Sequence, residues 1–158
     1  MFVLLRQLRQ VRREIALPRA ERGGSLAIRH IDAGSCNGCE HELNATNSPY
    51  YDMARFGISV VASPRHADVL LITGAITTRM VGPLMAAHDA MPEPRRVAAL
   101  GDCALGRNVL GNSEELAGNV EDLLPVDVRI AGCPPTPEQI IEGLAPLLGV
   151  NSDDYSDA

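Results

Sequence analysis

The sequence predicts an α/β protein with a doubly wound, parallel β-sheet. From about residue 25 onward, strand-like segments alternate with segments of helical length, a pattern typical of βαβ units. Residues 68–74 (DVLLITG) form a continuous apolar run, which suits a strand covered on both faces. Near the end of the chain, Thr136 and Pro137 form a pair favoured at the start of a helix.

Residues 25–74 are expected to hold three strands and one helix. The expected strands are residues 25–31 (SLAIRHI), 57–63 (GISVVAS) and 68–74. A helix is expected from after Cys39 to about Asn47, because Pro49 cannot continue it. These elements match the start of a βαβ arrangement.

The second half is expected to alternate helices with strands. The expected helices are residues 78–91, 113–124 and 136–148, and the expected strands are 96–102 and 127–132. The first of these helices is predicted despite Gly82 and Pro83. Ser113 and Thr136 are the expected caps of the later two, because a side-chain hydroxyl can accept from a free amide of the first turn.

Composition limits the class of protein. The 158 residues suit one domain, and 46% hydrophobic with 22% charged residues is normal for a globular chain. A 3% aromatic content, no Trp and a pI of about 5.1 argue against a nucleic-acid partner. The sequence lacks a run of ~20 apolar residues and a secretory signal, so we expect a cytoplasmic protein with reduced cysteines.

Charge is distributed unevenly and suggests three segments. Residues 1–29 contain seven arginines and two acidic residues, giving a net charge of +5, whereas the remainder carries −11. We expect residues 1–22 to be a basic amphipathic helix that lies on an anionic membrane surface or docks on a membrane subunit. An ordinary solvated terminal helix is the alternative. Residues 23–149 form the expected main domain, and residues 150–158 an acidic tail.

The four cysteines fall after predicted strands. Cys36 and Cys39 follow the first strand, Cys103 follows strand 96–102, and Cys133 follows the last strand. In an open parallel sheet such connections converge beyond the carboxyl ends of the strands, so the thiols are expected at one site. Nearby glycines would let the backbone bend closely around a bulky inorganic group. They are Gly34, Gly38, Gly101 and Gly132.

Spacing leaves several kinds of cysteine site open. One C-x-x-C pair with two isolated cysteines favours a 4Fe-4S cluster over structural zinc, which usually has two short pairs. The Cys133–Pro134 pair also matches the Cys-Pro that closes ferredoxin ligand runs. Structural zinc, a redox-active C-x-x-C and unrelated cysteines remain alternatives.

Three motifs together resemble a known family. These are GSCNGCEHEL (34–43), GDC (101–103) and GCPPTPEQIIEGL (132–144), in that order. They resemble the small subunit of energy-converting, membrane-bound nickel–iron hydrogenases, including formate hydrogenlyase, and the 20 kDa subunit of respiratory NADH:quinone oxidoreductase. The resemblance covers about residues 25–148. It implies a flavodoxin-like fold and one 4Fe-4S cluster held by Cys36, Cys39, Cys103 and Cys133.

The resemblance also implies a function and partners. The expected role is to transfer electrons from a ferredoxin-like iron–sulfur subunit to a nickel–iron hydrogenase-type large subunit. The complex would include integral membrane subunits, and this chain would lie on the inner face of the cytoplasmic membrane. The catalytic centre would lie on the large subunit, with no catalytic residue on this chain. The C-x-x-C spacing of Cys36 and Cys39 favours the hydrogenase branch, because the quinone-reducing subunits resemble this chain but have adjacent cysteines. A quinone-reductase subunit is the nearest alternative, and a zinc-stabilised binding module is a more distant one.

Other polar residues have weaker assignments. Glu42 stands where the family has an acidic residue. It could assist proton movement or pair with an Arg of the large subunit, and the alternative is a solvated carboxylate at the start of a helix. His41 is expected at an interface. Three further residues are candidates for hydrogen bonds around the cluster or for ordinary surface ion pairs, namely Arg79, Asp102 and Arg107. The remaining histidines, His30, His66 and His88, are isolated in the sequence, and an ordinary structural role is expected for all three.

Overall fold

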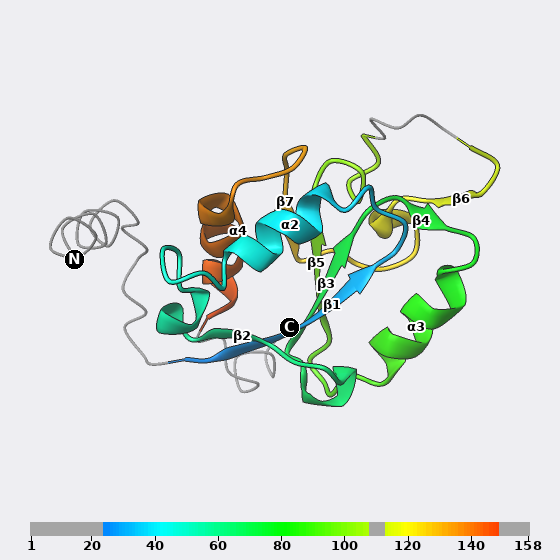
Figure 1. Ribbon diagram of the computed structural model, residues 1–158. Helices are drawn as coiled ribbons and strands as arrows, with labels where there is room; N and C mark the ends of the chain where they lie inside the picture. The colour runs from blue at the N-terminus through cyan, green and yellow to red at the C-terminus, as the bar shows by residue number, and fades with distance from the viewer. Residues whose placement is uncertain (1–23, 108–112, 149–158) are drawn as a thin grey trace, which may run out of the picture.

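The chain folds around a five-stranded sheet in which every pairing is parallel. We describe residues 24–107 and 113–148 of a computed structural model. The strand order is β2-β1-β3-β5-β7 (Figure 1). Counting only these strands, this is the order 2-1-3-4-5 of flavodoxin-like folds, in which ligands bind beyond the carboxyl ends of the strands. The predicted doubly wound α/β class is therefore confirmed.

The elements have the following bounds. The strands of the main sheet are β1 (Leu26–Asp32), β2 (Ile58–Val60), β3 (Val69–Thr73), β5 (Arg96–Leu100) and β7 (Val128–Ile130). The α-helices are α2 (Gly38–Ala45), α3 (Val81–Asp89) and α4 (Pro137–Leu144). Short 3-10 turns are η1 (Met53–Phe56), η2 (Pro64–His66), η3 (Val120–Asp122) and η4 (Ala145–Leu147). A small antiparallel pair comprises β4 (Ile76–Thr77) and β6 (Leu116–Gly118).

Two apolar layers hold helices against the two faces of the sheet. Alternate residues of β3 point to opposite faces, so Leu71 packs in the layer that contains Leu43 of α2 and Ile140 of α4. Leu70 packs in the other layer, with Leu84 of α3. In Figure 1, α2 and α4 accordingly lie together and apart from α3. All residues of β3 and β5 are buried, so these strands are apolar rather than alternating, except for Thr73 at the end of β3 and Arg96 at the start of β5.

One predicted element is wrong. Residues 113–124 were expected to form a helix, but the structure has strand β6 and the turn η3 there. Gly118 adopts φ +130°, which an α-helix excludes, and pairs with Ile76 of β4. The side chain of Asn119 then caps η3 by accepting from the Asp122 amide at 3.2 Å. Pairing with β4 thus overrides a local sequence that has helical character.

Other differences concern boundaries. Strand β2 is shorter than its predicted segment, while the last predicted helix is divided into α4 and η4. The expected basic helix (residues 1–22) and acidic tail (150–158) lie outside the described residues. Within the described residues, no helix has both the length and the apolar character needed to cross a membrane.

Candidate metal centre

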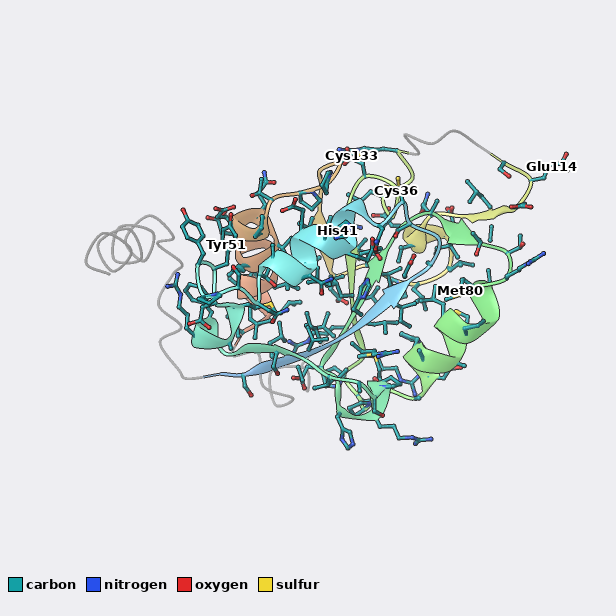
Figure 2. The ribbon with its side chains drawn as sticks, viewed as in Figure 1. Cys36, His41, Tyr51, Met80, Glu114 and Cys133 are labelled. Carbon is teal, nitrogen blue, oxygen red and sulfur yellow. The ribbon has the colours of Figure 1, made fainter. Side chains whose placement is uncertain are left out.

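Three loops at the carboxyl ends of parallel strands carry the cysteines. Cys36 and Cys39 follow β1, Cys103 follows β5, and Cys133 follows β7. Figure 2 shows Cys36 and Cys133 at the same end of the sheet, next to the start of α2. The topology therefore brings together the loops that the sequence predicted would converge.

The loop after β1 is shaped by local hydrogen bonds. Oδ1 of Asp32 accepts from the amides of Gly34 and Ser35 at 2.9 and 2.8 Å. Asn37 then adopts a left-handed conformation (φ 71°), and α2 begins at Gly38. The first amides of a helix have no acceptor within it, so those following Asn37 are available to a negatively charged group beside Cys36.

Asp102 joins the other two loops. The Asp102 amide donates to the Gly132 carbonyl at 2.9 Å, and the Gly132 amide donates back to Asp102 Oδ1 at 3.0 Å. Arg107 also donates to Asp102 Oδ1 at 3.3 Å. The reciprocal pair fixes the position of Cys103 relative to Cys133. Asp102 therefore joins the two loops that carry Cys103 and Cys133, and Arg107 forms an ion pair with it at the surface.

Gly101 permits the closest backbone approach to a thiol. Its φ is +90°, and a Cβ built on it would overlap Sγ of Cys39. This residue precedes Asp102, and its amide donates to the Ile130 carbonyl at 2.8 Å. Any side chain at this position would fill the space occupied by the Cys39 thiol.

The four thiols influence one another electrostatically. Burial raises the pKa of the Cys39 thiol to about 12. Smaller contributions in the same direction come, in decreasing order, from Glu40, Cys103, Cys36 and Cys133. The pKa of Cys133 is also raised, by desolvation first and then by Cys103, Cys36 and Asp102. Cys36, Cys103 and Cys133 therefore lie near enough to Cys39 to affect its pKa.

The donor set is suited to a soft metal centre. All four cysteines are free thiols; Cys36 and Cys133 are exposed, while Cys39 and Cys103 are half-buried. Thiolates are the usual ligands of iron–sulfur clusters and of zinc. Across residues 24–107 and 113–148, no three His, Cys, Asp or Glu side chains are grouped closely enough to hold a single metal ion.

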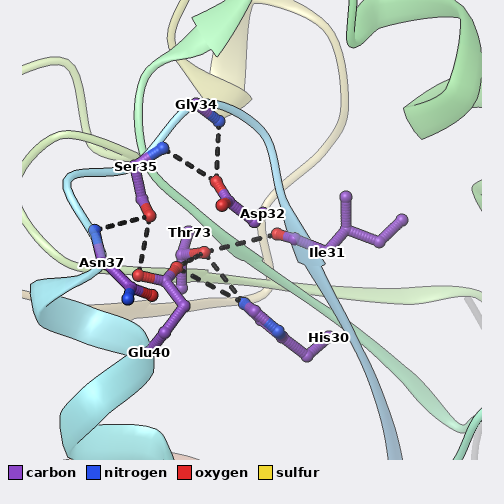
Figure 3. Close-up of polar contacts among 8 residues, drawn as sticks. All are labelled: His30, Ile31, Asp32, Gly34, Ser35, Asn37, Glu40 and Thr73. Atoms are coloured by element: carbon purple, nitrogen blue, oxygen red, sulfur yellow. Dashed lines mark hydrogen bonds and ion pairs between the residues drawn. The ribbon is translucent and has the colours of Figure 1, made fainter.

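A buried carboxylate lies directly beside this centre. Glu40, in the first turn of α2, is only 9% exposed. Its carboxylate accepts from the hydroxyls of Ser35, at 2.7 Å, and Thr73, and lies 3.6 Å from His30 Nε2 (Figure 3). His30 therefore takes part in a local network of polar side chains, which agrees with the structural role expected of it. Burial lowers the pKa of His30, against the opposing effects of Glu40 and Asp32.

The other acidic residue of α2 is Glu42, for which the sequence suggested a role near the cluster. Glu42 is half-buried and lies near Tyr51, whose pKa is raised by burial and Glu138, with a smaller contribution from Glu42. Nothing in the sequence marks Glu40 as buried, because its partners Thr73 and His30 come from β3 and β1. The one available signal was its position between Cys39 and an expected helix.

The remaining candidates lie at the surface. His41 is exposed, and its Nε2 accepts from the side-chain amide of Asn37 at 3.3 Å. Arg79 lines an open hollow of about 450 Å³ with four other residues, Thr77, Thr78, Glu114 and Glu115. His66 is exposed, whereas Nδ1 of His88 lies 3.7 Å from Asp89 Oδ1. These contacts place none of these histidines against a cysteine.

Comparison with known proteins identifies one family. Residues 36–147, which include all four cysteines, match the family described as NADH ubiquinone oxidoreductase, 20 Kd subunit. Formate hydrogenlyase subunit 7 of Escherichia coli K12 is 44% identical over 126 residues. That match covers 80% of this chain and 49% of the relative, so this chain spans about half of that relative's length.

A second relative and a solved structure agree with this match. A probable membrane-bound hydrogenase subunit, mbhJ, of Pyrococcus furiosus is 41% identical over 122 residues, covering 77% of this chain and 73% of the relative. A chain in the structure of an archaeal membrane-bound sulfane sulfur reductase superposes with a TM-score of 0.68 at 33% identity. The superposition covers 80% of this chain and 70% of the other.

Proposed function

We propose, from the premise that this chain belongs to the NADH ubiquinone oxidoreductase 20 Kd subunit family, that it is an iron–sulfur electron-transfer subunit of a membrane-associated hydrogenase complex. The observation that carries the proposal is that the loops after β1, β5 and β7, at the carboxyl end of one parallel sheet, carry four free thiols. Cys36, Cys39, Cys103 and Cys133 would hold one 4Fe-4S cluster. Such a cluster takes up and releases one electron at a time.

The chain's own groups support this role. Gly101 leaves room for the Cys39 thiol, and Asp102 holds the Cys103 and Cys133 loops together. The free amides at the start of α2 favour negative charge beside Cys36. Half-burial of Cys39 and Cys103 shields one side of the centre from water, whereas Cys36 and Cys133 remain on the surface that a partner can cover.

The proposed partners follow from the relatives. A relative named as a membrane-bound hydrogenase subunit and one named as a formate hydrogenlyase subunit support a hydrogenase complex rather than an isolated protein. We propose that electrons from a ferredoxin-like subunit pass through this chain to a nickel–iron-type large subunit. The complex would include integral membrane subunits and lie on the inner face of the cytoplasmic membrane, with residues 1–22 contributing to docking there.

Cluster content tests this proposal directly. The full chain is reconstituted anaerobically with iron and sulfide, and iron, acid-labile sulfide and the EPR spectrum of the reduced protein are measured. We expect about four irons and four sulfides per chain, and loss of the cluster in Cys103→Ser. A preparation that binds zinc but no sulfide would instead support a zinc-stabilised binding module.

A quinone-reducing complex is the second candidate, because the family description itself names ubiquinone oxidoreductase. The large subunit that co-purifies with this chain distinguishes a hydrogenase complex from a quinone-reducing complex. Cysteines that ligate nickel in the co-purifying large subunit support the hydrogenase, whereas quinone-dependent oxidation of the reduced cluster in a complex without those cysteines supports the alternative.

A further inference from the structure

The carboxylate of Glu40 links two segments that lie far apart in the sequence. Glu40 follows Cys39 directly, while its partner Thr73 ends β3, 33 positions later. The side chain is buried, so its negative charge requires partners inside the protein. Both carboxylate oxygens have one: Thr73 donates to Oε1 and Ser35 donates to Oε2. The group is therefore held from both sides.

Proton counting fixes the direction of these hydrogen bonds. The Thr73 hydroxyl has one proton, and the possible acceptors within its reach are Glu40 Oε1, His30 Nε2 at 2.9 Å and the Ile31 carbonyl at 3.4 Å. A carboxylate is the stronger acceptor, so Thr73 donates to Glu40. His30 Nε2, at 2.9 Å, then donates to the Thr73 oxygen. His30 and Thr73 thus form a chain of donors that ends at Glu40.

The second oxygen is tied to the cysteine loop. Ser35 Oγ donates to Glu40 and accepts from the Asn37 amide at 3.0 Å. Asp32 accepts from the Ser35 amide at the same turn. The residues on both sides of Cys36 are therefore connected to one carboxylate (Figure 3).

We propose that Glu40 is a positioning residue for the metal centre, fastening the loop that carries Cys36 and Cys39 to strand β3, and that its charge lowers the reduction potential of a cluster bound there. This inference rests on the proposed function. An electron added to a centre near a fixed negative charge is disfavoured, and a buried site is screened less by water and salt than an exposed one. Glu40 therefore combines a mechanical and an electrostatic effect on one centre.

Hydrogen exchange tests the mechanical part without any metal. Amide exchange over residues 34–39 is followed by mass spectrometry in the full metal-free chain, for wild type, Glu40→Gln, Thr73→Val and Thr73→Ser. A glutamine has one acceptor oxygen for two hydroxyl donors, so we expect exchange to accelerate by about tenfold or more, as for loss of one hydrogen bond to a charged group. Thr73→Val should act similarly, and Thr73→Ser should restore the wild-type rate. Equal amide exchange rates in all four proteins would overturn the proposal that Glu40 fastens the cysteine loop to β3.

A redox titration tests the electrostatic part. The midpoint potential of the reconstituted full chain is measured by EPR for wild type, Glu40→Gln and Glu142→Gln. Glu142 is exposed on α4, so its substitution is a matched control that removes the same charge. We expect a higher potential in Glu40→Gln and a nearly unchanged potential in Glu142→Gln.

The outcomes separate this inference from the proposed function. If Glu40→Gln and wild type both hold a cluster and have equal midpoint potentials, the electrostatic effect proposed for Glu40 is overturned while the proposed function stands. A folded Glu40→Gln chain that loses iron while Glu142→Gln keeps it supports the positioning role. A wild-type chain that takes up no iron and sulfide overturns the proposed function, and the inference with it.

Discussion

Among single residues, Gly101 controls how closely strand β5 approaches the first cysteine loop. Its positive φ and its contact with the Cys39 thiol are separate constraints, and both exclude a larger residue. A substitution there must change the backbone and move the thiol. Stability and metal binding should therefore be affected together.

Gly101→Ala should destabilise the chain by about 1–3 kcal/mol, the usual cost of holding a residue in a disfavoured backbone conformation, and should lower iron uptake. Urea unfolding of the metal-free chain measures the first effect, and iron content after reconstitution the second. Gly82→Ala is the control, because that glycine lies in α3 with open space around it and no positive φ. Similar results for both variants would contradict this interpretation of Gly101.

His30 should make stability depend on pH. Burial lowers its pKa from 6.5, outweighing Glu40 and Asp32, which raise it, while Arg29 lowers it slightly. The unfolded chain therefore binds a proton more readily than the native chain. The contribution to stability is full above the unfolded pKa and is lost as pH falls from about 6.5 towards the lower folded value.

The check is a comparison of wild type with His30→Gln, whose side-chain amide can replace the Nε2 donor. Urea midpoints of the metal-free chain are measured at about pH 7.5 and about pH 5.5, on either side of the ordinary His pKa. We expect a smaller decrease on acidification in the variant. An equal decrease in both proteins would show that His30 has no part in the acid sensitivity.

The residues of the site differ in how far the sequence could predict them. The four cysteines could be placed together because each follows a predicted strand of one parallel sheet. Asp102 was recognised only as a candidate. The contact of buried Glu40 with Thr73 and the pairing of His30 could not be predicted, since both depend on strand register, which is not visible in a single sequence.

At the level of elements, the start of α4 fixes the loop that carries Cys133. The Thr136 side chain accepts from the Gln139 amide at 3.4 Å, and Gln139 Oε1 accepts from the Thr136 amide at 2.9 Å. Pro137 occupies the first turn, and Ile140, Ile141 and Leu144 are buried against the sheet. The capping box thus defines where the loop ends and the helix begins.

Thr136→Ala should lower the free energy of unfolding by about 1 kcal/mol, within the 0.5–2 kcal/mol typical of a lost cap. Thr136→Ser retains the hydroxyl and should remain near wild type. Urea denaturation followed by far-UV circular dichroism measures both. A serine variant as unstable as the alanine variant would indicate that the Thr136 methyl group, rather than its hydroxyl, is responsible.

The elements, like the residues of the site, divide into those that local sequence signals predict and those that depend on a distant partner. Strand β3 and helix α4 were predicted because an unbroken apolar run and a helix-starting Thr-Pro pair are local signals. The segment 113–124 was not, because its strand forms only by pairing with β4. In that pair Gly118 lies opposite Ile76, and Leu116 lies opposite Thr77. A local pattern cannot report a partner that is distant in the sequence.

For the whole molecule, a bound cluster would connect the ends of three strands. The loops after β1, β5 and β7 span the sheet from near one edge to the other. A group that binds the folded chain and not the unfolded one stabilises the fold. The effect should therefore be global and not confined to one loop.

Removal of the metal should lower the melting temperature of the reconstituted chain. A ligand present at 100 times its Kd contributes about 2.7 kcal/mol, which corresponds to roughly 5 to 11 °C for a chain of this size. Anaerobic thermal unfolding before and after chelation measures the difference. Cys103→Ser treated in the same way is the control and should show little change. An unchanged melting temperature in wild type would mean that the three loops are held equally well without metal.

The separation of the cysteines along the chain also orders events during biosynthesis. Cys133 lies 94 positions after Cys39 and follows β7, the last strand of the sheet to be synthesised. At ~5–20 residues per second, the first pair of thiols emerges about 5 to 20 seconds before Cys133 is synthesised. A cofactor that requires all four thiols must therefore be inserted after translation has passed β7, and the cell must keep the early thiols reduced until then.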